Sequence, residues 1–424
     1  MRSHVVDIPR IRNQETPAMN DRERFLATMH YRERDRCPIM DFSFWDETIE
    51  LWYEQGLPGH VDRSNSDAHF GMEPLEHVVI ANLNVATFAP TATKTVVPDR
   101  GVNVGLLPSF DSEVLEDRGD HEVVQQADGV RVLRKKFMSS IPSHQGHLLV
   151  DRNSWVEHYR PRLDPDAPDR LPDDWDEHVA RWKDPDRDYP LFLPGGSLYG
   201  WIRNWMGVEA VSYVVYDDPA WFEEMVGTVA DCTLGVLTRV LESGVRFDGC
   251  SMWEDMCYNA GPLLSPALFE RYLTPHYRRL TDLLRRHGVD VIWVDCDGKI
   301  DELVPLWLEA GVNCMMPIEI GTWDADPVAF RREFGRDLLL MGGFDKHVLA
   351  RSKDEIEREI RRLAPLVEDG GYIPFCDHRV PPDVPYEHYC FYVETARSVW
   401  GRDVNLKPCH FRADQAAVVP DHDV

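Results

Sequence analysis

The sequence has no long apolar run and few basic residues. None of its apolar stretches approaches the roughly 18 residues of a membrane-spanning helix, and its N-terminus lacks the apolar core of a signal peptide. Its 46 lysines and arginines face 73 aspartates and glutamates, which gives a formal net charge of −27. Nucleic acids and anionic membranes attract basic proteins, so we expect neither as a partner and expect a cytoplasmic protein.

Paired cysteine motifs and phosphate-binding loops are also absent. The nine cysteines form no Cys-x-x-Cys motif, and several lie inside apolar runs. An odd number of cysteines without tight pairing is typical of reduced thiols that pack in a core. The glycine pairs at 195–196 and 342–343 match no phosphate-binding pattern.

Short apolar runs that end in polar or charged residues recur along the chain. Buried parallel strands have continuous apolar sequences, and a (β/α)8 barrel carries its chemistry where such strands end. A first strand is predicted at Arg36–Phe42. The other six runs are Leu191–Ser197, Gly249–Asp255, Val291–Gly298, Cys314–Glu319, Leu338–Lys346 and Tyr372–His378. The sequence therefore predicts an enzyme with a (β/α)8 barrel in which seven strands are evident and the eighth is irregular or hidden in an insertion.

Between the apolar runs the pattern is helical, with one exception. Helices are expected at 21–30, 46–55, 200–216, 219–243, 265–288, 299–311, 326–335, 352–368 and 386–400. Short alternating segments at 94–98, 112–116, 121–125 and 130–134, with Asp128-Gly129 between two of them, predict an antiparallel β insertion at about 78–157. We expect a mobile lead at 1–20, a single barrel domain at 21–400 and an extension at 401–424.

Two aspartates end the strand at 291–295. Residues two apart on a strand face the same side, so Asp295 and Asp297 are expected to project together, away from Cys296. Two close carboxylates need a metal, a cation or a shared proton. The structural alternative is that Asp297 caps the helix that follows it.

Cys376 and His378 end the last strand. Thiolate, imidazole and carboxylate ligands suit zinc, so we predict a metal site from Asp297, Cys376, Asp295 and His378. A cysteine in an apolar strand is also ordinary core packing. His378 is equally a candidate general acid or base, together with Glu254 and Asp295.

Aromatic and charged residues at the other strand ends are candidates for substrate binding. Arg203 and Lys346 could anchor an anionic group, although each could equally form a surface ion pair. The aromatic residues suggest a pocket with aromatic walls. The predicted substrate-binding residues are Trp45, Tyr199, Arg203, Trp253, Tyr258, Glu319 and Lys346.

Five segments together resemble the uroporphyrinogen decarboxylase superfamily, over about residues 20–400. They are Asp21–Met29, Met252–Met256, Val294–Gly298, Gly342–Lys346 and Asp377–Asp383. The resemblance implies a (β/α)8 barrel and one of two chemistries. True uroporphyrinogen decarboxylases carry an Arg-Gln-Ala-Gly-Arg segment after the first strand, and here Asp41–Asp46 has no arginine. We therefore reject haem biosynthesis.

The sequence is more similar to the zinc-dependent corrinoid methyltransferases of the superfamily. Those enzymes bind zinc through a His-x-Cys-Gly strand end and a later cysteine. Aligned on Gly298, the histidine falls on Asp295, the first cysteine on Asp297 and the later cysteine on Cys376. Two soft ligands have become carboxylates, which argues against activation of a thiol, whereas a metal could still polarise an oxygen.

The resemblance leads to three hypotheses. In the first, the chain moves a methyl group from a small methylated substrate, such as an aryl methyl ether, to a corrinoid. The chain lacks an Asp-x-His-x-x-Gly corrinoid motif, so the corrinoid would be on a separate protein. The second is a metal-free decarboxylase or lyase acting on a small carboxylate. The third is a non-catalytic protein that binds a corrinoid or tetrapyrrole. A homodimer is compatible with all three.

Overall fold

The computed structural model describes residues 18–73, 76–77, 102–136 and 142–401 of the chain. A parallel sheet of seven strands lies at its centre, in the order β1-β6-β7-β10-β11-β12-β13. The strands are β1 (Glu76–His77), β6 (Leu191–Pro194), β7 (Gly249–Trp253), β10 (Ile292–Asp295), β11 (Cys314–Met316), β12 (Leu339–Met341) and β13 (Tyr372–Ile373).

The predicted first strand closes this sheet in an irregular form. Residues 37–45 are not a regular strand, but Val380 N donates to Ser43 O (3.0 Å) and Glu73 N donates to Ile39 O (2.9 Å). The segment therefore lies between the continuation of β13 and the residues that lead into β1. Ser43 has a φ of +91°, which interrupts a regular ladder. The fold is a (β/α)8 barrel, as the sequence predicts.

Strand residues alternate between the barrel interior and the surrounding helices. Val291 and Trp293 belong to the interior cluster, whereas Ile292 and Val294 belong to the larger cluster that includes the helices. Phe25 of helix α1 (Asp21–Met29) also joins the interior cluster and packs edge-on against Phe192, at 5.5 Å between ring centroids. Helix α1 thus packs against the interior of the barrel, and polar chemistry is left to the carboxyl ends of the strands.

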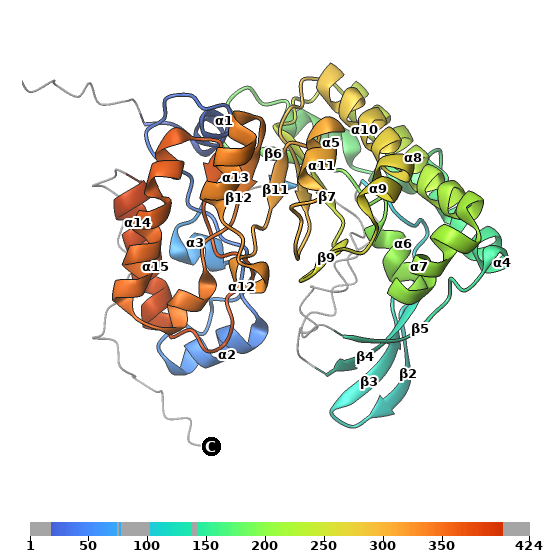
Figure 1. The fold of residues 1–424 in the computed structure, drawn as a ribbon, viewed down its shortest axis with the longest axis horizontal. Coiled ribbons are helices and arrows are strands. Elements are labelled where there is room, and N and C mark those ends of the chain that lie inside the picture. The colour runs from blue at the N-terminus through green and yellow to red at the C-terminus, as the bar shows by residue number, and fades with distance from the viewer. Residues whose placement is uncertain (1–17, 74–75, 78–101, 137–141, 402–424) are drawn as a thin grey trace, which may run out of the picture.

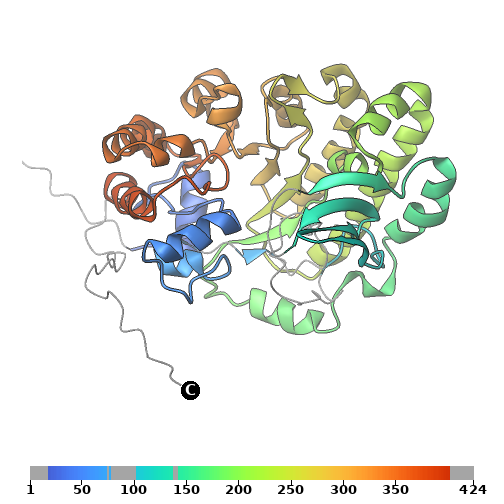
Figure 2. The same ribbon diagram turned by 90° about the horizontal axis from the view of Figure 1, so that it is seen from below.

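Most of the helices lie around the outside of the strands (Figures 1 and 2). The expected helix at 200–216 is broken at Gly207, whose φ is +88°, and the one at 265–288 breaks between Tyr272 and Thr274. The remaining helices are α2 (Asp46–Glu54), α3 (Ser66–Phe70), α4 (Arg152–Ser154), α5 (Trp175–Trp182), α6 (Gly200–Met206), α7 (Val208–Asp217), α8 (Pro219–Glu242), α9 (Pro266–Tyr272), α10 (Thr274–Arg286), α11 (Val304–Glu309), α12 (Ile320–Trp323), α13 (Pro327–Phe334), α14 (Lys353–Asp369) and α15 (Tyr386–Trp400).

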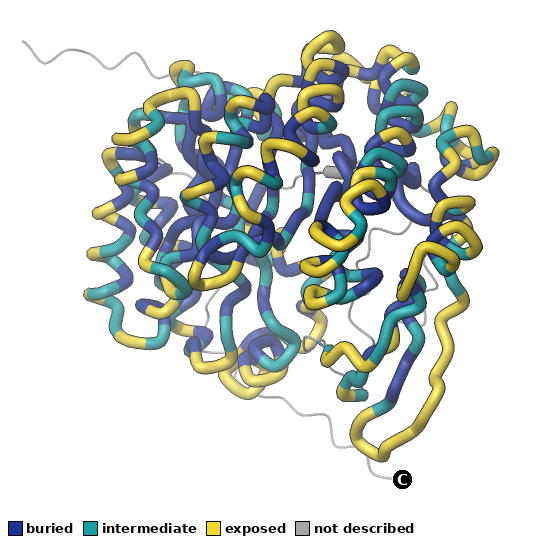
Figure 3. Tube along the Cα trace, turned by 45° about the vertical axis from the view of Figure 1, so that its right-hand side comes forward, coloured by how far each residue is buried: buried dark blue, intermediate teal, exposed yellow. Residues whose placement is uncertain are grey.

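An antiparallel sheet of four strands forms the predicted insertion. It consists of β2 (Glu113–Arg118), β3 (His121–Gln125), β4 (Val130–Lys135) and β5 (Ser143–His147), in that order. Figure 1 shows this sheet projecting beyond α6 and α7, and Figure 3 shows that β2 is exposed. A separate hairpin of β8 (Cys257–Tyr258) and β9 (Gly261–Pro262) follows β7.

Some expectations fall on parts of the chain that the structure does not describe. The segment predicted at 94–98, nearly all of the lead at 1–20 and nearly all of the extension at 401–424 lie outside the described residues. Among the helices that are described, none has both the length and the apolar composition required to cross a membrane.

Candidate active site

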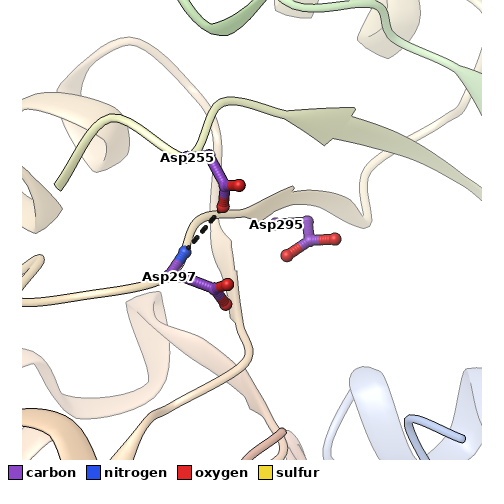
Figure 4. Close-up of side chains that lie close together, drawn as sticks. All are labelled: Asp255, Asp295 and Asp297. Atoms are coloured by element: carbon purple, nitrogen blue, oxygen red, sulfur yellow. Dashed lines mark hydrogen bonds between the residues drawn. The ribbon is translucent and has the colours of Figure 1, made fainter. Parts of the chain in front are cut away.

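Three aspartates gather at the carboxyl ends of β7 and β10. Asp295 pairs in register with Trp253, and Asp255 follows two residues later. The backbone N–H of Asp297 donates to Asp255 Oδ1 at 3.2 Å. One carboxylate oxygen of each of Asp255, Asp295 and Asp297 lies within 4.8 Å of the other two (Figure 4). We call these three residues the aspartate cluster.

The cluster lines a cavity of about 120 Å³. His378 lies beside it, with Nε2 3.4 Å from Asp297 Oδ2. The Phe42 ring lies 5.2 Å from the His378 ring, and the Trp45 ring lies 6.0 Å from it. The residues that line the cavity are Phe42, Trp253, Asp255, Asp295, Asp297, His378 and Arg379.

Burial and mutual repulsion disfavour full ionisation of the cluster. Burial, and after it the charge of Asp297, raises the pKa of Asp255 to about 7. Burial and the two neighbouring aspartates raise the pKa of Asp295 well above its usual value. Glu319 shares this environment, and burial followed by Asp297 raises its pKa. Near neutral pH the cluster therefore favours a bound proton or a bound cation.

Two arginines partly balance this charge. Arg203 Nη2 lies 3.8 Å from Asp255 Oδ2, and its guanidinium lies 5.5 Å from the Trp253 ring centroid. The Arg379 guanidinium lies 5.1 Å from the ring of Trp45. Burial, with Arg63 nearby, lowers the pKa of Arg379 to about 10. An anionic substrate group could approach either guanidinium.

A family profile and several known proteins match this chain. Residues 204–399 match the family described as "Uroporphyrinogen decarboxylase (URO-D)". The chain contains a uroporphyrinogen decarboxylase-family domain. The matched residues include Trp253, the aspartate cluster and His378.

Curated relatives of this uroporphyrinogen decarboxylase-family domain match only part of the chain. A uroporphyrinogen decarboxylase of Syntrophotalea carbinolica is 29% identical over 194 residues, which are 44% of this chain and 51% of that protein. One of Thermus thermophilus is 32% identical over 141 residues, which are 32% of this chain and 38% of that protein. The match thus spans about half the length of the Syntrophotalea carbinolica protein and a smaller share of the Thermus thermophilus protein.

A solved structure matches the fold over most of the chain. A methyltransferase from Methanosarcina mazei aligns with 90% of this chain and 99% of its own, with a TM-score of 0.57 and 13% sequence identity. At that identity the likeness concerns the fold alone.

Cys376 lies apart from the aspartate cluster, contrary to the predicted ligand set. Ile373 and Phe375 belong to the cluster of side chains in the barrel interior, whereas Cys376 belongs to the larger cluster that includes the helices. Its thiol is buried beside Asp41 and Tyr392, and burial raises its pKa well above the usual value. The alternation that brings Asp295 and Asp297 to the mouth thus directs Cys376 towards the helices of this family domain.

Glu254 also has a different role from the predicted one. Its buried carboxylate accepts hydrogen bonds from the backbone N–H groups of residues 198, 199 and 200 (2.8–2.9 Å) and from the hydroxyls of Ser197 and Tyr277. Burial raises its pKa, and these donors oppose the rise. Its five donors make Glu254 an anchor for the start of α6, not a group that faces the cavity.

The remaining predicted residues divide between the rim and the core. Lys346 Nζ lies 3.1 Å from the buried Asp377, which also accepts from three backbone N–H groups, so the Lys346 ammonium is paired within the protein. Tyr199 is buried against Phe222, and Tyr258 is 68% exposed, outside the cavity. Glu319 accepts from Gly298 N at 2.6 Å and thereby positions the loop after Asp297.

Three cavity residues were missed by sequence reasoning. Asp255 and Arg379 directly follow the predicted site residues Glu254 and His378, and Phe42 ends the predicted first strand. Asp255 has a φ of +45°, and this left-handed conformation turns the chain after β7. Strand alternation does not extend through such a turn, so the only available signal was its position at a strand end.

Proposed function

We propose that the chain is a metal-assisted methyltransferase that takes a methyl group from a small methylated substrate, for example an aryl methyl ether, and gives it to a corrinoid on a separate protein. The observation that carries this proposal is the aspartate cluster beside His378, in a small cavity with aromatic walls. The family domain and the fold shared with a methyltransferase support it.

The ligand atoms at this site fit a cation that prefers oxygen. Three carboxylates and one neighbouring imidazole suit zinc, manganese or magnesium. Asp297 Oδ1 is a buried oxygen without a hydrogen-bond partner among the described residues, so it is available to a cation. Cys376 does not fit such a site, and the ligands would be Asp255, Asp295 and Asp297, with His378 alongside.

The chain's own residues supply binding and proton transfer. A bound cation would act as a Lewis acid on the oxygen that leaves when the methyl group departs. The rings of Phe42 and Trp253 hold the apolar part of the substrate at the cavity wall. His378 Nε2 lies 3.4 Å from Asp297 Oδ2 and is the group that transfers a proton to the leaving oxygen. A cavity of about 120 Å³ suits a small reacting group.

The test is an assay of methyl transfer to cob(I)alamin. The absorbance change that accompanies methylation of the cobalamin measures the rate. The purified chain is incubated with a panel of aryl methyl ethers, and methylation is expected for at least one donor. Asp297→Asn should lower the rate by roughly a hundredfold or more, because it removes a ligand and the neighbour of His378. Asp231→Asn, which changes a surface aspartate, is the matched control and should keep the wild-type rate. A chain that methylates cob(I)alamin from no donor contradicts the proposal.

A second candidate is metal-free decarboxylation. The matched relatives are uroporphyrinogen decarboxylases, and the raised pKa of Asp255 and Asp295 provides protonated carboxyls that could donate to a carbanion. Arg203 or Arg379 would then hold the substrate carboxylate. Turnover of a small carboxylate that persists after exhaustive chelation would favour this candidate over methyl transfer.

A further inference from the structure

A second and larger cavity adjoins the one at the aspartate cluster. It measures about 210 Å³, and Phe42 lines both cavities. We call it the inner cavity. One wall consists of barrel-interior side chains, and the other comes from residues 40–42 and from the stretch 67–73 that begins in α3. Its lining residues are Met40, Asp41, Phe42, Asp67, Met72, Glu73, Trp293, Met316, Met341 and Phe375.

Every ionisable residue in the described part of this lining is an acid. Glu73 is already paired, since Arg24 and Arg36 both contact its carboxylate. Asp41 accepts from the Tyr389 hydroxyl and from the N–H of Phe42. No hydrogen bond or ion pair reaches the Asp67 carboxylate from the described part of the chain, and Asp67 is exposed, which gives a ligand access. Among the described residues Asp67 therefore has no cationic partner, and partial burial raises its pKa.

Asp41 and Asp67 also influence each other electrostatically. Burial raises the pKa of Asp41 to about 7, and the charge of Asp67 contributes to the rise. Two carboxyls that repel each other across a cavity are both stabilised by a cation between them. The described residues of the lining include no lysine, arginine or histidine that could take this place.

The rest of the lining suits an organic cation better than a metal ion. Phe42, Trp293 and Phe375 provide aromatic rings, and the four methionines provide flexible, polarisable contacts. The negative faces of aromatic rings attract ammonium groups and bind their alkyl substituents. A strongly hydrated metal ion gains nothing from such walls, because it needs oxygen ligands on most sides.

We infer that the inner cavity binds a small alkylated ammonium ion, with Asp67 and Asp41 providing the charge and the aromatic rings contacting the alkyl groups. Binding does not depend on methyl transfer. A role of this cavity in catalysis does rest on the proposed function. In that case the methyl donor would carry an ammonium group, which would lie on the far side of Phe42 from the aspartate cluster.

Calorimetric titration with choline and with its neutral isostere 3,3-dimethylbutan-1-ol tests this inference. The full-length chain is used after chelation, so that metal binding does not contribute. Choline should bind at one site, and the neutral isostere should bind at least about tenfold more weakly, because it lacks only the charge. Equal affinities for the two compounds, or no binding of choline, would overturn the inference.

Two variants locate the binding. Asp67→Asn should weaken choline binding by about tenfold or more, as expected for loss of the unbalanced charge. Glu50→Gln, which removes an exposed acid on α2, is the matched control and should bind like the wild type. Thermal melts check that both variants are folded. Choline affinity unchanged in Asp67→Asn would place any binding elsewhere and overturn the inference.

The two proposals can fail separately. Choline binding without methyl transfer from any donor would leave the inner-cavity assignment standing and contradict the proposed function. Methyl transfer to cob(I)alamin without choline binding would support the proposed function and overturn the inner-cavity inference.

Discussion

Asp255 combines an unusual backbone conformation with an unfavourable electrostatic position. Its φ of +45° lies in the left-handed region, and its carboxylate is crowded by Asp297. Asparagine tolerates this conformation well and keeps the oxygen that accepts from Asp297 N. Strain and repulsion of this kind are typical of residues retained for function at the expense of stability.

We therefore predict that Asp255→Asn stabilises the metal-free chain. Replacing one of three crowded carboxyls with a neutral amide should raise the free energy of unfolding by about 1 kcal/mol or more, and the thermal midpoint of the chelated protein with it. The same variant should bind a divalent cation more weakly. A lower midpoint than wild type in chelator would show that the carboxylate is there for stability.

Glu254 offers a contrasting prediction at the next position. Glu254→Gln replaces an acceptor of five hydrogen bonds with an amide, whose NH₂ group would face backbone donors. The change should lower the free energy of unfolding by roughly 3 kcal/mol, measured by urea denaturation. A variant as stable as the wild type but inactive would instead restore the catalytic role that the sequence suggested.

Asp41 should give the stability of the chain a measurable pH dependence. Its pKa is raised to about 7 in the folded protein, whereas it is about 3.9 in an unfolded chain. The folded state therefore binds the extra proton between these values, and this contribution to stability is lost as the pH rises from about 4 to 7.

The Asp41→Asn variant isolates this contribution. Between pH 5 and pH 7.5 the wild type should lose roughly 1–3 kcal/mol more unfolding free energy than the variant, since the amide that replaces the carboxyl does not titrate. Urea denaturation at both pH values measures the difference. Parallel curves for the two proteins would mean that Asp41 keeps an ordinary pKa.

The sequence could indicate which residue types lie at the mouth but not which way each one faces. Asp295 and Asp297 follow from alternation within one strand, since they are two residues apart. The direction of Cys376 depends on which side of β13 faces the interior, and an apolar run such as Tyr372–Cys376 has the same composition on both sides. Lys346 could not be assigned because its partner, Asp377, is 31 residues away along the chain.

At the scale of elements, Asp248 joins three parts of the barrel's amino-terminal end. Its carboxylate accepts from Arg22 of α1 (2.8 Å), contacts the buried Arg187 (2.9 Å) and accepts from Leu191 N at the start of β6 (3.0 Å). Removing one partner of such a buried ion pair lowers the stability of the fold, because the other partner stays buried with its charge unpaired.

Asp248→Asn should accordingly destabilise the barrel. We expect a loss of roughly 3–5 kcal/mol in the free energy of unfolding, because Arg187 keeps its charge without its partner. Asp231→Asn, which breaks an exposed pair with Arg279, serves as the matched control and should change stability by less than about 1 kcal/mol. Equal effects of the two substitutions would rule out this role for Asp248.

Elements with strong apolar patterns were predictable, and irregular ones were not. The helix breaks at Gly207 and Leu273 were missed because the apolar pattern continues through both positions. Strand β5 is Ser-His-Gln-Gly-His, which has no apolar alternation and is held by its pairing with β4. The first barrel strand is interrupted by the positive φ of Ser43, which composition does not reveal.

For the whole molecule, the barrel brings together residues that are far apart in sequence. Phe42, Asp255, Asp297 and His378 line one cavity, although more than 300 residues separate the first from the last. The sequence could predict that strand ends meet, because parallel strands of a barrel present their carboxyl ends on one side. It could not predict which ends are close enough to share a cation, since this depends on register.

Metal stoichiometry tests the central claim most directly. The purified chain is saturated in turn with zinc, manganese and magnesium, desalted, and analysed for metal content by mass spectrometry beside Asp297→Asn and Cys376→Ala. The account predicts about one divalent ion per chain in the wild type and in Cys376→Ala, and a loss of that ion in Asp297→Asn. A wild type that retains no ion, or an ion lost from Cys376→Ala and kept in Asp297→Asn, would contradict it.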